Sequence, residues 1–321
     1  MHCLVTGASG FIGRVLSSEL VKSGHRVTGL FRNRANGPWT DHLLIDLGSQ
    51  SIPDELLSGV DVIYHLAGIA HDIHGSKYNE ADYQRINVQA TIDLARQARL
   101  SGARHFIHFS SVKAVADPGE NCVDESWDVW PADIYGRSKR EAEEALLELH
   151  KAGDCTVTIL RPTLVYGQGI KGNLAQMVNA IRSGYFPSLP ETGNRRSLIH
   201  VLDLVDIAQH LALQPLAYGK TYIVSERVAY STRRIYELMC SGLHKSVSKW
   251  TIPQSVLQGI ARIGDSLESL TGKSFPVNSS ILGKLFGSAC YQSNLLRDEF
   301  NWQPARTLDG SIDEIVEERS P

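Results

Sequence analysis

The stretch that decides the fold is TGASGFIG, residues 6–13, which follows a short apolar run at residues 2–5. Its glycines, Gly7, Gly10 and Gly13, stand three residues apart, and apolar residues then recur at helical spacing as far as residue 21. A glycine-rich turn between a strand and a helix lets the backbone approach a diphosphate, and the helix N-terminus offers free N–H groups to it. Residues 6–13 therefore predict a dinucleotide-binding turn; the alternative is a glycine turn that binds nothing.

The rest of the chain alternates short apolar runs with helical patterns. Strands are expected at 27–31, 60–67, 106–110, 156–161 and 220–224, and helices at 83–99, 138–150 and 201–213. Strands that are apolar on both faces and alternate with helices indicate a parallel sheet covered on both sides. We therefore predict an α/β fold, a Rossmann-type doubly wound parallel sheet that binds its ligands at the carboxyl ends of the strands.

After Pro162 the chain is rich in glycine and proline, and from residue 231 its pattern is mainly helical. This change predicts a smaller, mainly helical C-terminal lobe. We assign residues 1–161 plus 201–229 to the dinucleotide-binding domain and residues 162–200 plus 230–321 to a substrate lobe.

Charge and cysteine content exclude several classes of protein. The 321 residues include 32 Lys and Arg against 35 Asp and Glu, so the chain lacks the basic excess that binding of nucleic acid or acidic lipid requires. We expect neither a signal peptide nor a membrane span, and we expect a cytoplasmic protein. The cysteines are odd in number, widely spaced and without a Cys-x-x-Cys pair, so we expect neither a disulfide framework nor a metal site. They are Cys3, Cys122, Cys155, Cys240 and Cys290.

The second expected strand ends without the acid that commonly binds the ribose diol of NAD. Residues 29–34 read GLFRNR and contain no carboxylate. Arg32 and Arg34, with Arg14 after the last glycine, suit a 2′-phosphate instead. The sequence thus favours NADP(H). NAD(H) stays open, because the alternative for these arginines is ordinary solvated surface.

Two further groups of residues point to hydride-transfer chemistry. Tyr135 and Lys139 lie four residues apart, which places them on one face of a helix. A free phenol has a pKa of about 10, and a neighbouring ammonium and an oxidised nicotinamide favour the phenolate, so we expect the pKa of Tyr135 to be lowered. Ser110 and Ser111 end a strand at the ligand-binding edge, where a hydroxyl can hydrogen-bond a substrate oxygen.

These motifs together resemble the extended short-chain dehydrogenase/reductases, specifically the nucleotide-sugar epimerase/dehydratase group, over nearly the whole chain. The resemblance implies that Ser111 and Tyr135 hold the reacting oxygen and that Lys139 holds the nicotinamide ribose and tunes the tyrosine. Further positions that it implies at the cofactor, besides the glycines, are Phe11, Ile12, Arg32, Asp46, Leu47, Leu66, Ala67, Gly68, Asn87 and Pro162.

The resemblance extends to the substrate lobe. KGNL at 171–174 and RRSLIHVLD at 195–203 are similar to segments that meet a nucleotide diphosphate, which implies contacts from Asn173 and Arg196. The alternative for Arg196 is an ordinary solvated arginine before a strand. The family's later Arg-x-Gly-Asp phosphate clamp is missing, because FGSA stands near that place at 286–289. Part of the nucleotide site is therefore different.

The same resemblance suggests a reaction. The acid pair that follows the catalytic hydroxyl residue in 4,6-dehydratases is replaced by Val112 and Lys113, which disfavours dehydration. The motifs are most similar to bacterial enzymes of surface-polysaccharide (O-antigen) synthesis. We therefore expect NAD(P)H-dependent reduction of the C4 ketone of a UDP-4-keto-6-deoxy-N-acetylhexosamine to UDP-N-acetylquinovosamine or UDP-N-acetylfucosamine. A UDP-hexose or UDP-N-acetylhexosamine 4-epimerase is the alternative, and a non-catalytic dinucleotide-binding protein is a third. The family also implies a homodimer.

Overall fold

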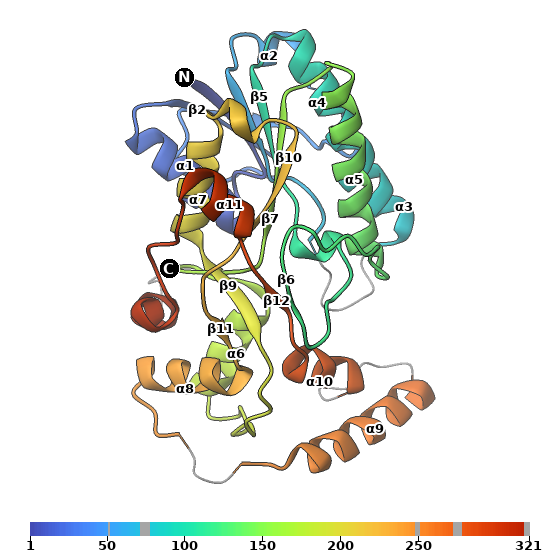
Figure 1. Cartoon of the computed structure of the whole chain (residues 1–321), viewed down its shortest axis with the longest axis vertical. Helices are drawn as coiled ribbons and strands as arrows, with labels where there is room; N and C mark the ends of the chain where they lie inside the picture. Colours follow the sequence, from blue (N-terminus) through green and yellow to red (C-terminus); the bar gives the residue numbers. More distant parts are fainter. Residues whose placement is uncertain (51, 71–77, 248–250, 272–277, 318–321) are drawn as a thin grey trace.

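A seven-stranded parallel sheet forms the centre of the molecule in this computed structural model, which describes residues 1–50, 52–70, 78–247, 251–271 and 278–317. The strand order is β10-β7-β5-β4-β1-β2-β3 (Figure 1). This order, with neighbouring strands parallel throughout, confirms the predicted doubly wound fold. The strands are β1 His2–Thr6, β2 Arg26–Phe31, β3 Asp41–Leu44, β4 Val62–His65, β5 His105–Phe109, β7 Val157–Pro162 and β10 Lys220–Val224.

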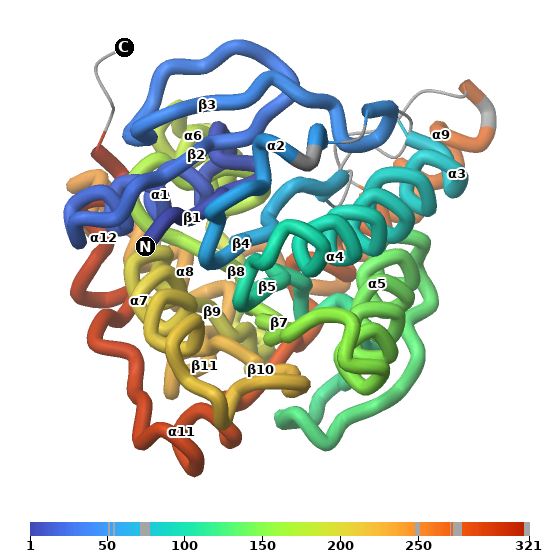
Figure 2. Tube along the Cα trace, turned by 90° about the horizontal axis from the view of Figure 1, so that it is seen from above, coloured from blue at the N-terminus to red at the C-terminus, as the bar shows by residue number. Residues whose placement is uncertain are grey.

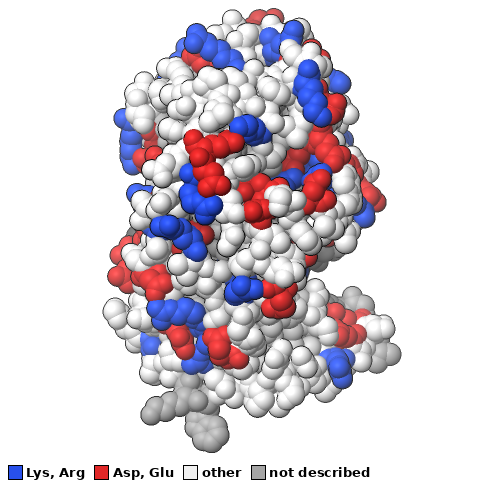
Figure 3. All heavy atoms as spheres, viewed as in Figure 1, with Lys and Arg blue, Asp and Glu red and all other residues white. Residues whose placement is uncertain are grey.

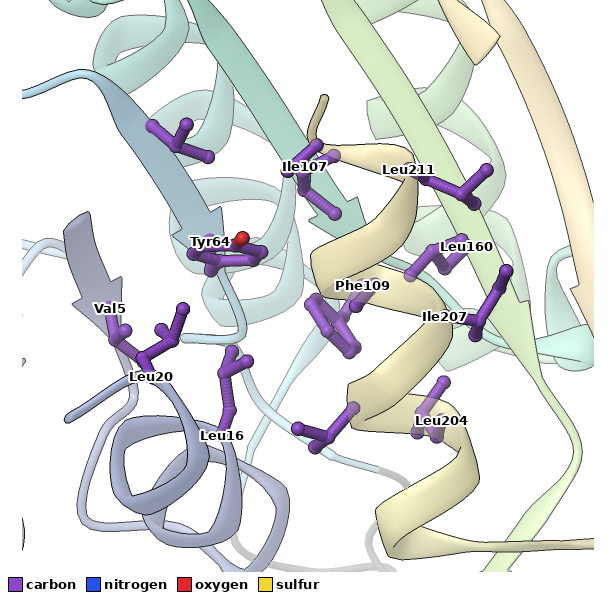
Figure 4. Packing of buried hydrophobic residues seen from close by; sticks show 14 of the residues in the cluster. Val5, Leu16, Leu20, Tyr64, Ile107, Phe109, Leu160, Leu204, Ile207 and Leu211 are labelled. Atoms are coloured by element: carbon purple, nitrogen blue, oxygen red, sulfur yellow. The ribbon is translucent and has the colours of Figure 1, made fainter. Parts of the chain in front are cut away.

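Helices cover both faces of this sheet (Figure 2). Helices α1 (Phe11–Lys22) and α7 (Val201–Leu211) lie on one face, and α4 (Ala90–Leu100) and α5 (Ile134–Lys151) lie on the other. Successive side chains of a strand point to opposite faces. In β5, Ile107 and Phe109 accordingly pack toward α1 and α7 (Figure 4), whereas Phe106 packs toward α4 and α5.

The connection from β4 to β5 is not the single helix expected at 83–99. It consists of α3 (Glu80–Tyr83), a π-helical segment (Gln84–Gln89) and α4. Asn79 begins α3 with a capping box, in which its side chain accepts a hydrogen bond from the Asp82 N–H. π-Helical turns are rare and often occur at functional sites, and this one carries the buried Asn87.

A second lobe lies below the sheet in the view of Figure 1. Its small sheet has the order β11-β9-β8, and α6 and α8 pack against it in a separate core. Helices α9 and α10 pack on each other. The division into residues 1–161 plus 201–229 and residues 162–200 plus 230–321 stays a prediction. The remaining elements are α2 Asp54–Leu57, β6 Cys122–Val123, β8 Leu164–Tyr166, α6 Gly172–Arg182, β9 Arg196–His200, β11 Ala229–Tyr230, α8 Thr232–Gly242, α9 Gln254–Thr271, α10 Ser279–Phe286, β12 Cys290–Tyr291, α11 Asn294–Phe300, α12 Ile312–Val316 and 3₁₀ turns at Val112–Ala114, Pro215–Ala217 and Asp309–Ser311.

The structure contains a disulfide between Cys122 and Cys290, so the expectation of no disulfide is wrong. The short strands β6 and β12 pair in parallel and bring the two Cα atoms to 4.5 Å. The two cysteines are 168 residues apart, and sequence spacing carries no sign of such a long-range pairing. Cys3, Cys155 and Cys240 are free.

The surface agrees with the nearly balanced charge of the sequence. Figure 3 shows basic and acidic side chains intermixed over the face that it draws. Among the described residues, none of the helices is both long and apolar enough to cross a membrane.

Candidate active site

The glycine turn between β1 and α1 is packed against the end of β4. Gly7 has a φ of +68°, a conformation that glycine adopts without strain, and a Cβ there would come 2.9 Å from the Ala67 nitrogen. A Cβ at Gly13 would collide with the Gly7 carbonyl oxygen. The Thr6 hydroxyl joins the same two strands, because it accepts hydrogen bonds from the N–H groups of Leu66 (3.2 Å) and Ala67 (3.1 Å). The turn can therefore be this tight only with glycine at these positions.

The N-terminus of α1 is suited to bind an anion. Its capping residue is Gly10, so no side chain satisfies the first N–H groups, and the first turn contains no acidic residue. Phe11 and Ile12 are half-buried there. Free N–H groups at the positive end of a twelve-residue helix fit the diphosphate of a dinucleotide. The residues present thus fit the expected cofactor.

The other expected cofactor positions lie beyond the carboxyl ends of adjacent parallel strands. Arg32 is exposed directly after β2, Asp46 and Leu47 are half-buried after β3, and Pro162 ends β7. Leu66, Ala67 and Gly68 follow β4. Because neighbouring parallel strands end at the same edge of the sheet, these residues share one edge.

Asn87 uses its side chain within the protein. Its Oδ1 accepts a hydrogen bond from the Ile69 N–H (2.7 Å), and its Nδ2 donates to the Ile69 carbonyl (3.1 Å) and to the Ser138 hydroxyl (3.0 Å). A Cβ at Gly68 would come 2.9 Å from Asn87 Oδ1. Asn87 therefore connects the segment after β4 with α5.

The structure brings Ser111, Tyr135 and Lys139 together. Tyr135 is the second residue of α5, whose N-terminus is capped by Asp133, and Lys139 lies one turn further along. Ser111 follows β5 and its side chain hydrogen-bonds the Tyr135 phenol. The Lys139 ammonium is buried and donates to the Phe109 carbonyl oxygen (2.8 Å). The predicted catalytic residues thus meet where β5 ends and α5 begins.

The electrostatics of this set differ from expectation in one respect. Burial raises the pKa of Tyr135 to about 12, and the hydrogen bond with Ser111 offsets only part of that rise. The expectation that the pKa of Tyr135 is lowered is therefore wrong for the chain by itself. Loss of solvation disfavours the phenolate more than the neighbouring side chains favour it. Burial also lowers the pKa of Lys139 to about 8, while Glu143 acts to raise it. At neutral pH Tyr135 is a protonated phenol.

Ser110 presents a hydroxyl that has no hydrogen-bond partner in the described part of the chain. The residue is buried, and its backbone N–H donates to the Leu160 carbonyl oxygen (2.7 Å). Buried polar atoms are nearly always hydrogen-bonded, so an orphaned one needs an explanation. The expected substrate contact of Ser110 stays a prediction.

Arg196 is a largely buried cation in the substrate lobe. One of its Nη atoms donates to the carbonyl oxygens of Lys284 (2.7 Å) and Gly287 (3.0 Å), and burial lowers its pKa. Within the described ranges it forms no salt bridge with a carboxylate. A guanidinium held by neutral carbonyls keeps its charge available for a phosphate. Asn173, the second residue of α6, is exposed, and His200 caps α7 by accepting from the Leu202 N–H.

Two buried polar groups near Lys139, an ion pair and a histidine, were not predicted from the sequence. Arg161 of β7 forms a bidentate ion pair with Glu143 of α5, with distances of 2.6 to 3.1 Å. His108 of β5 lies with its Nε2 3.3 Å from Lys139 Nζ. Polar residues inside otherwise apolar strands were the available signal for both.

A Rossmann-type sheet with a glycine turn and a Ser–Tyr–Lys set at its edge defines the class of short-chain dehydrogenase/reductases. The NAD dependent epimerase/dehydratase family model matches residues 3–224, and the chain belongs to this family. It is an enzyme of this NAD-dependent epimerase/reductase group.

The chain is similar to several characterised relatives. It is 31% identical over 313 residues to a UDP-glucose 4-epimerase of Vibrio cholerae, and the aligned residues cover 95% of this chain and 91% of the relative. It is 25% identical over 280 residues to the N-acetyl-α-D-glucosaminyl-diphospho-ditrans,octacis-undecaprenol 4-epimerase of Escherichia coli O157:H7, covering 87% and 83%. The UDP-glucuronic acid 4-epimerase of Bacillus cereus, solved with UDP-glucuronic acid and NAD, has the same fold, with a TM-score of 0.77, 19% identity and 98% of each chain covered.

Proposed function

We propose that this protein is a ketoreductase that uses NAD(P)H to reduce the C4 ketone of a UDP-4-keto-6-deoxy-N-acetylhexosamine. The products are UDP-N-acetylquinovosamine or UDP-N-acetylfucosamine for surface-polysaccharide synthesis. The observation that carries this proposal is the placement of Tyr135, which hydrogen-bonds Ser111 at the end of β5 and lies one helical turn from Lys139; burial, which raises the pKa of the phenol, supports it. Ketone reduction needs a proton donor at the reacting oxygen, whereas the oxidation that begins an epimerisation needs a base.

The residues of the chain have separate roles in this reaction. A reduced dinucleotide, held through its diphosphate at the glycine turn, would supply the hydride. Ser111 and Tyr135 hydrogen-bond the C4 oxygen, and Tyr135 gives its proton to that oxygen as negative charge develops on it. Lys139, one helical turn from Tyr135, stabilises the phenolate that remains.

Four observations support a nucleotide-sugar substrate and a reaction other than dehydration. The Arg196 guanidinium is suited to a diphosphate, and the unpartnered Ser110 hydroxyl lies beside Ser111. Lys113, which stands where dehydratases carry an acid, is paired with Asp117 at 2.6 Å, so this position supplies no acid for elimination. The Vibrio cholerae relative is named for a UDP-sugar.

The cofactor choice is part of the proposal. The exposed Arg32 and the lack of a carboxylate at the end of β2 support NADPH, while the family model names NAD. Replacing Arg32 with alanine should weaken NADPH binding about tenfold, the value of one charge-assisted contact, and leave NADH binding unchanged. Equal effects on both cofactors contradict an interaction with a 2′-phosphate.

A UDP-hexose 4-epimerase is the second candidate, favoured by the 31% identity to the Vibrio cholerae enzyme. The two functions separate when pure protein is incubated with UDP-4-keto-6-deoxy-N-acetylglucosamine and NADPH or NADH, and in parallel with UDP-glucose and NAD. Consumption of one reduced cofactor per sugar supports the reductase. Interconversion of UDP-glucose and UDP-galactose without net cofactor consumption supports the epimerase, and no reaction with any substrate supports a non-catalytic protein.

A pair of variants tests the diphosphate site. Arg196→Met should raise the KM of the nucleotide sugar at least about tenfold, because a charged hydrogen bond to phosphate is lost. Arg195→Met is the matched control, since the Arg195 guanidinium bonds the Glu120 carbonyl oxygen and its side chain is exposed. Equal KM values for both variants contradict a phosphate contact at Arg196.

A homodimer through α4 and α5 and a cytoplasmic location complete the proposal.

A further inference from the structure

His108 is a buried histidine close to Lys139, and the proposed function assigns it no role. Only 1% of its surface is exposed, and its Nδ1 has no hydrogen-bond partner among the described residues. Its Nε2 lies 3.3 Å from Lys139 Nζ. An apolar side chain would be the usual occupant of such a position, because a buried donor without a partner destabilises the fold.

The strand geometry explains where His108 points. Side chains alternate along β5, so His108 shares the face of Phe106, which packs toward α4 and α5. Its ring stacks on that of His65 from β4, with centroids 5.4 Å apart. His65 is itself fixed, because its ring nitrogens bond the hydroxyls of Thr6 and Thr91 at 2.8 Å each. His65, on the adjacent strand, therefore restricts the position of the His108 ring.

His108 is suited to accept a hydrogen bond from Lys139. Burial, followed by the nearby Lys139 and His65, lowers the pKa of His108 well below its usual value, so the ring is neutral. A neutral ring with its proton on Nδ1 presents a lone pair on Nε2. Among the described carboxylates, Glu143 is the one that acts on Lys139, and Arg161 already binds both of its oxygens.

We propose that His108 is a positioning residue for Lys139, an assignment that rests on the proposed function. An ammonium has three N–H groups. The Phe109 carbonyl accepts one at 2.8 Å and His108 Nε2 accepts a second. These two acceptors leave the third N–H for the cofactor and for the phenolate of Tyr135, which lies one helical turn away on α5. A neutral acceptor does this without neutralising the ammonium, which a carboxylate would do.

The test compares three variants of the full chain. His108→Leu removes the acceptor, and His108→Gln keeps an acceptor oxygen at a comparable distance from the backbone. His105→Leu is the matched control, because His105 is an equally buried histidine on the same strand whose ring bonds the Ala212 carbonyl (3.0 Å) and the Thr158 hydroxyl (2.9 Å), away from Lys139. NADH binding is measured by fluorescence titration, folding by the thermal midpoint, and turnover with UDP-4-keto-6-deoxy-N-acetylglucosamine.

His108→Leu should fold with an undiminished thermal midpoint, lose about tenfold in NADH affinity and about tenfold in kcat, and keep the KM of the sugar. His108→Gln should recover most of both losses. His105→Leu should lower the midpoint and leave NADH affinity and kcat unchanged. NADH affinity and kcat of wild-type size in folded His108→Leu overturn the proposal, as does a His108→Gln variant as impaired as His108→Leu. If wild-type protein turns over no keto sugar, the ketoreductase assignment fails, and the NADH titration still decides the role of His108.

Discussion

Removing the disulfide between Cys122 and Cys290 should have a large and measurable effect on stability. The bond closes a loop across 168 residues of sequence separation. For a loop of that length the chain-entropy relation gives about 5 kcal/mol of stabilisation at 25 °C, acting mainly by restricting the unfolded chain. Cys122→Ser should therefore lower the free energy of unfolding by up to about 5 kcal/mol relative to the oxidised wild type.

Urea unfolding of the oxidised wild type, the reduced wild type and Cys122→Ser measures this difference. Cys155→Ser is the matched control, because Cys155 is a free, half-buried cysteine. Thiol titration should count the three free cysteines in the denatured, unreduced protein and all five after reduction. Five reactive thiols before reduction, or a Cys122→Ser variant as stable as the oxidised wild type, refutes the reasoning.

Three further predictions concern the site and its support. Gly13→Ala places a methyl group against the Gly7 carbonyl oxygen, so dinucleotide affinity should fall at least about tenfold by fluorescence titration, and an unchanged affinity contradicts the packing account. Glu143→Gln leaves the Arg161 charge buried without its partner and should cost about 3 to 5 kcal/mol in urea unfolding, whereas a loss below about 1 kcal/mol shows that the pair is not desolvated. Lys139 has a pKa of about 8 in the folded protein and 10.5 as its ordinary value, so the unfolded chain binds its proton more tightly. This residue's contribution to stability therefore increases from pH 8 to pH 10, by about 2 kcal/mol. Urea unfolding of wild type and Lys139→Met across that range checks the sign, and a stability difference between the two that does not change with pH contradicts it.

The sequence was sufficient for the parts of the fold that depend on local patterns. The glycine spacing at residues 6–13 and the apolar strands lead directly to the parallel sheet, because strand and helix periodicities are local properties. The spacing of Tyr135 and Lys139 also predicts their common helix face, and Ser111 joins them because parallel strands end at one edge.

The sequence was insufficient where the outcome depends on distant residues or on solvation. The pairing of β6 with β12, and so the disulfide, depends on tertiary contacts. The pKa of Tyr135 depends on how much water the fold removes, which the spacing to Lys139 does not contain. The π-helical turn that carries Asn87 was equally hidden, because its residues continue a helical pattern.

Single-turnover kinetics of Tyr135→Phe test whether Tyr135 donates the proton in the reduction. Protein preloaded with reduced cofactor is mixed with UDP-4-keto-6-deoxy-N-acetylglucosamine, and oxidation of the cofactor is followed by absorbance. We expect unchanged cofactor affinity and a rate at least about 10³-fold below wild type, within the range that a general acid supplies. A rate within about tenfold of wild type would show that another group donates the proton and would contradict the account.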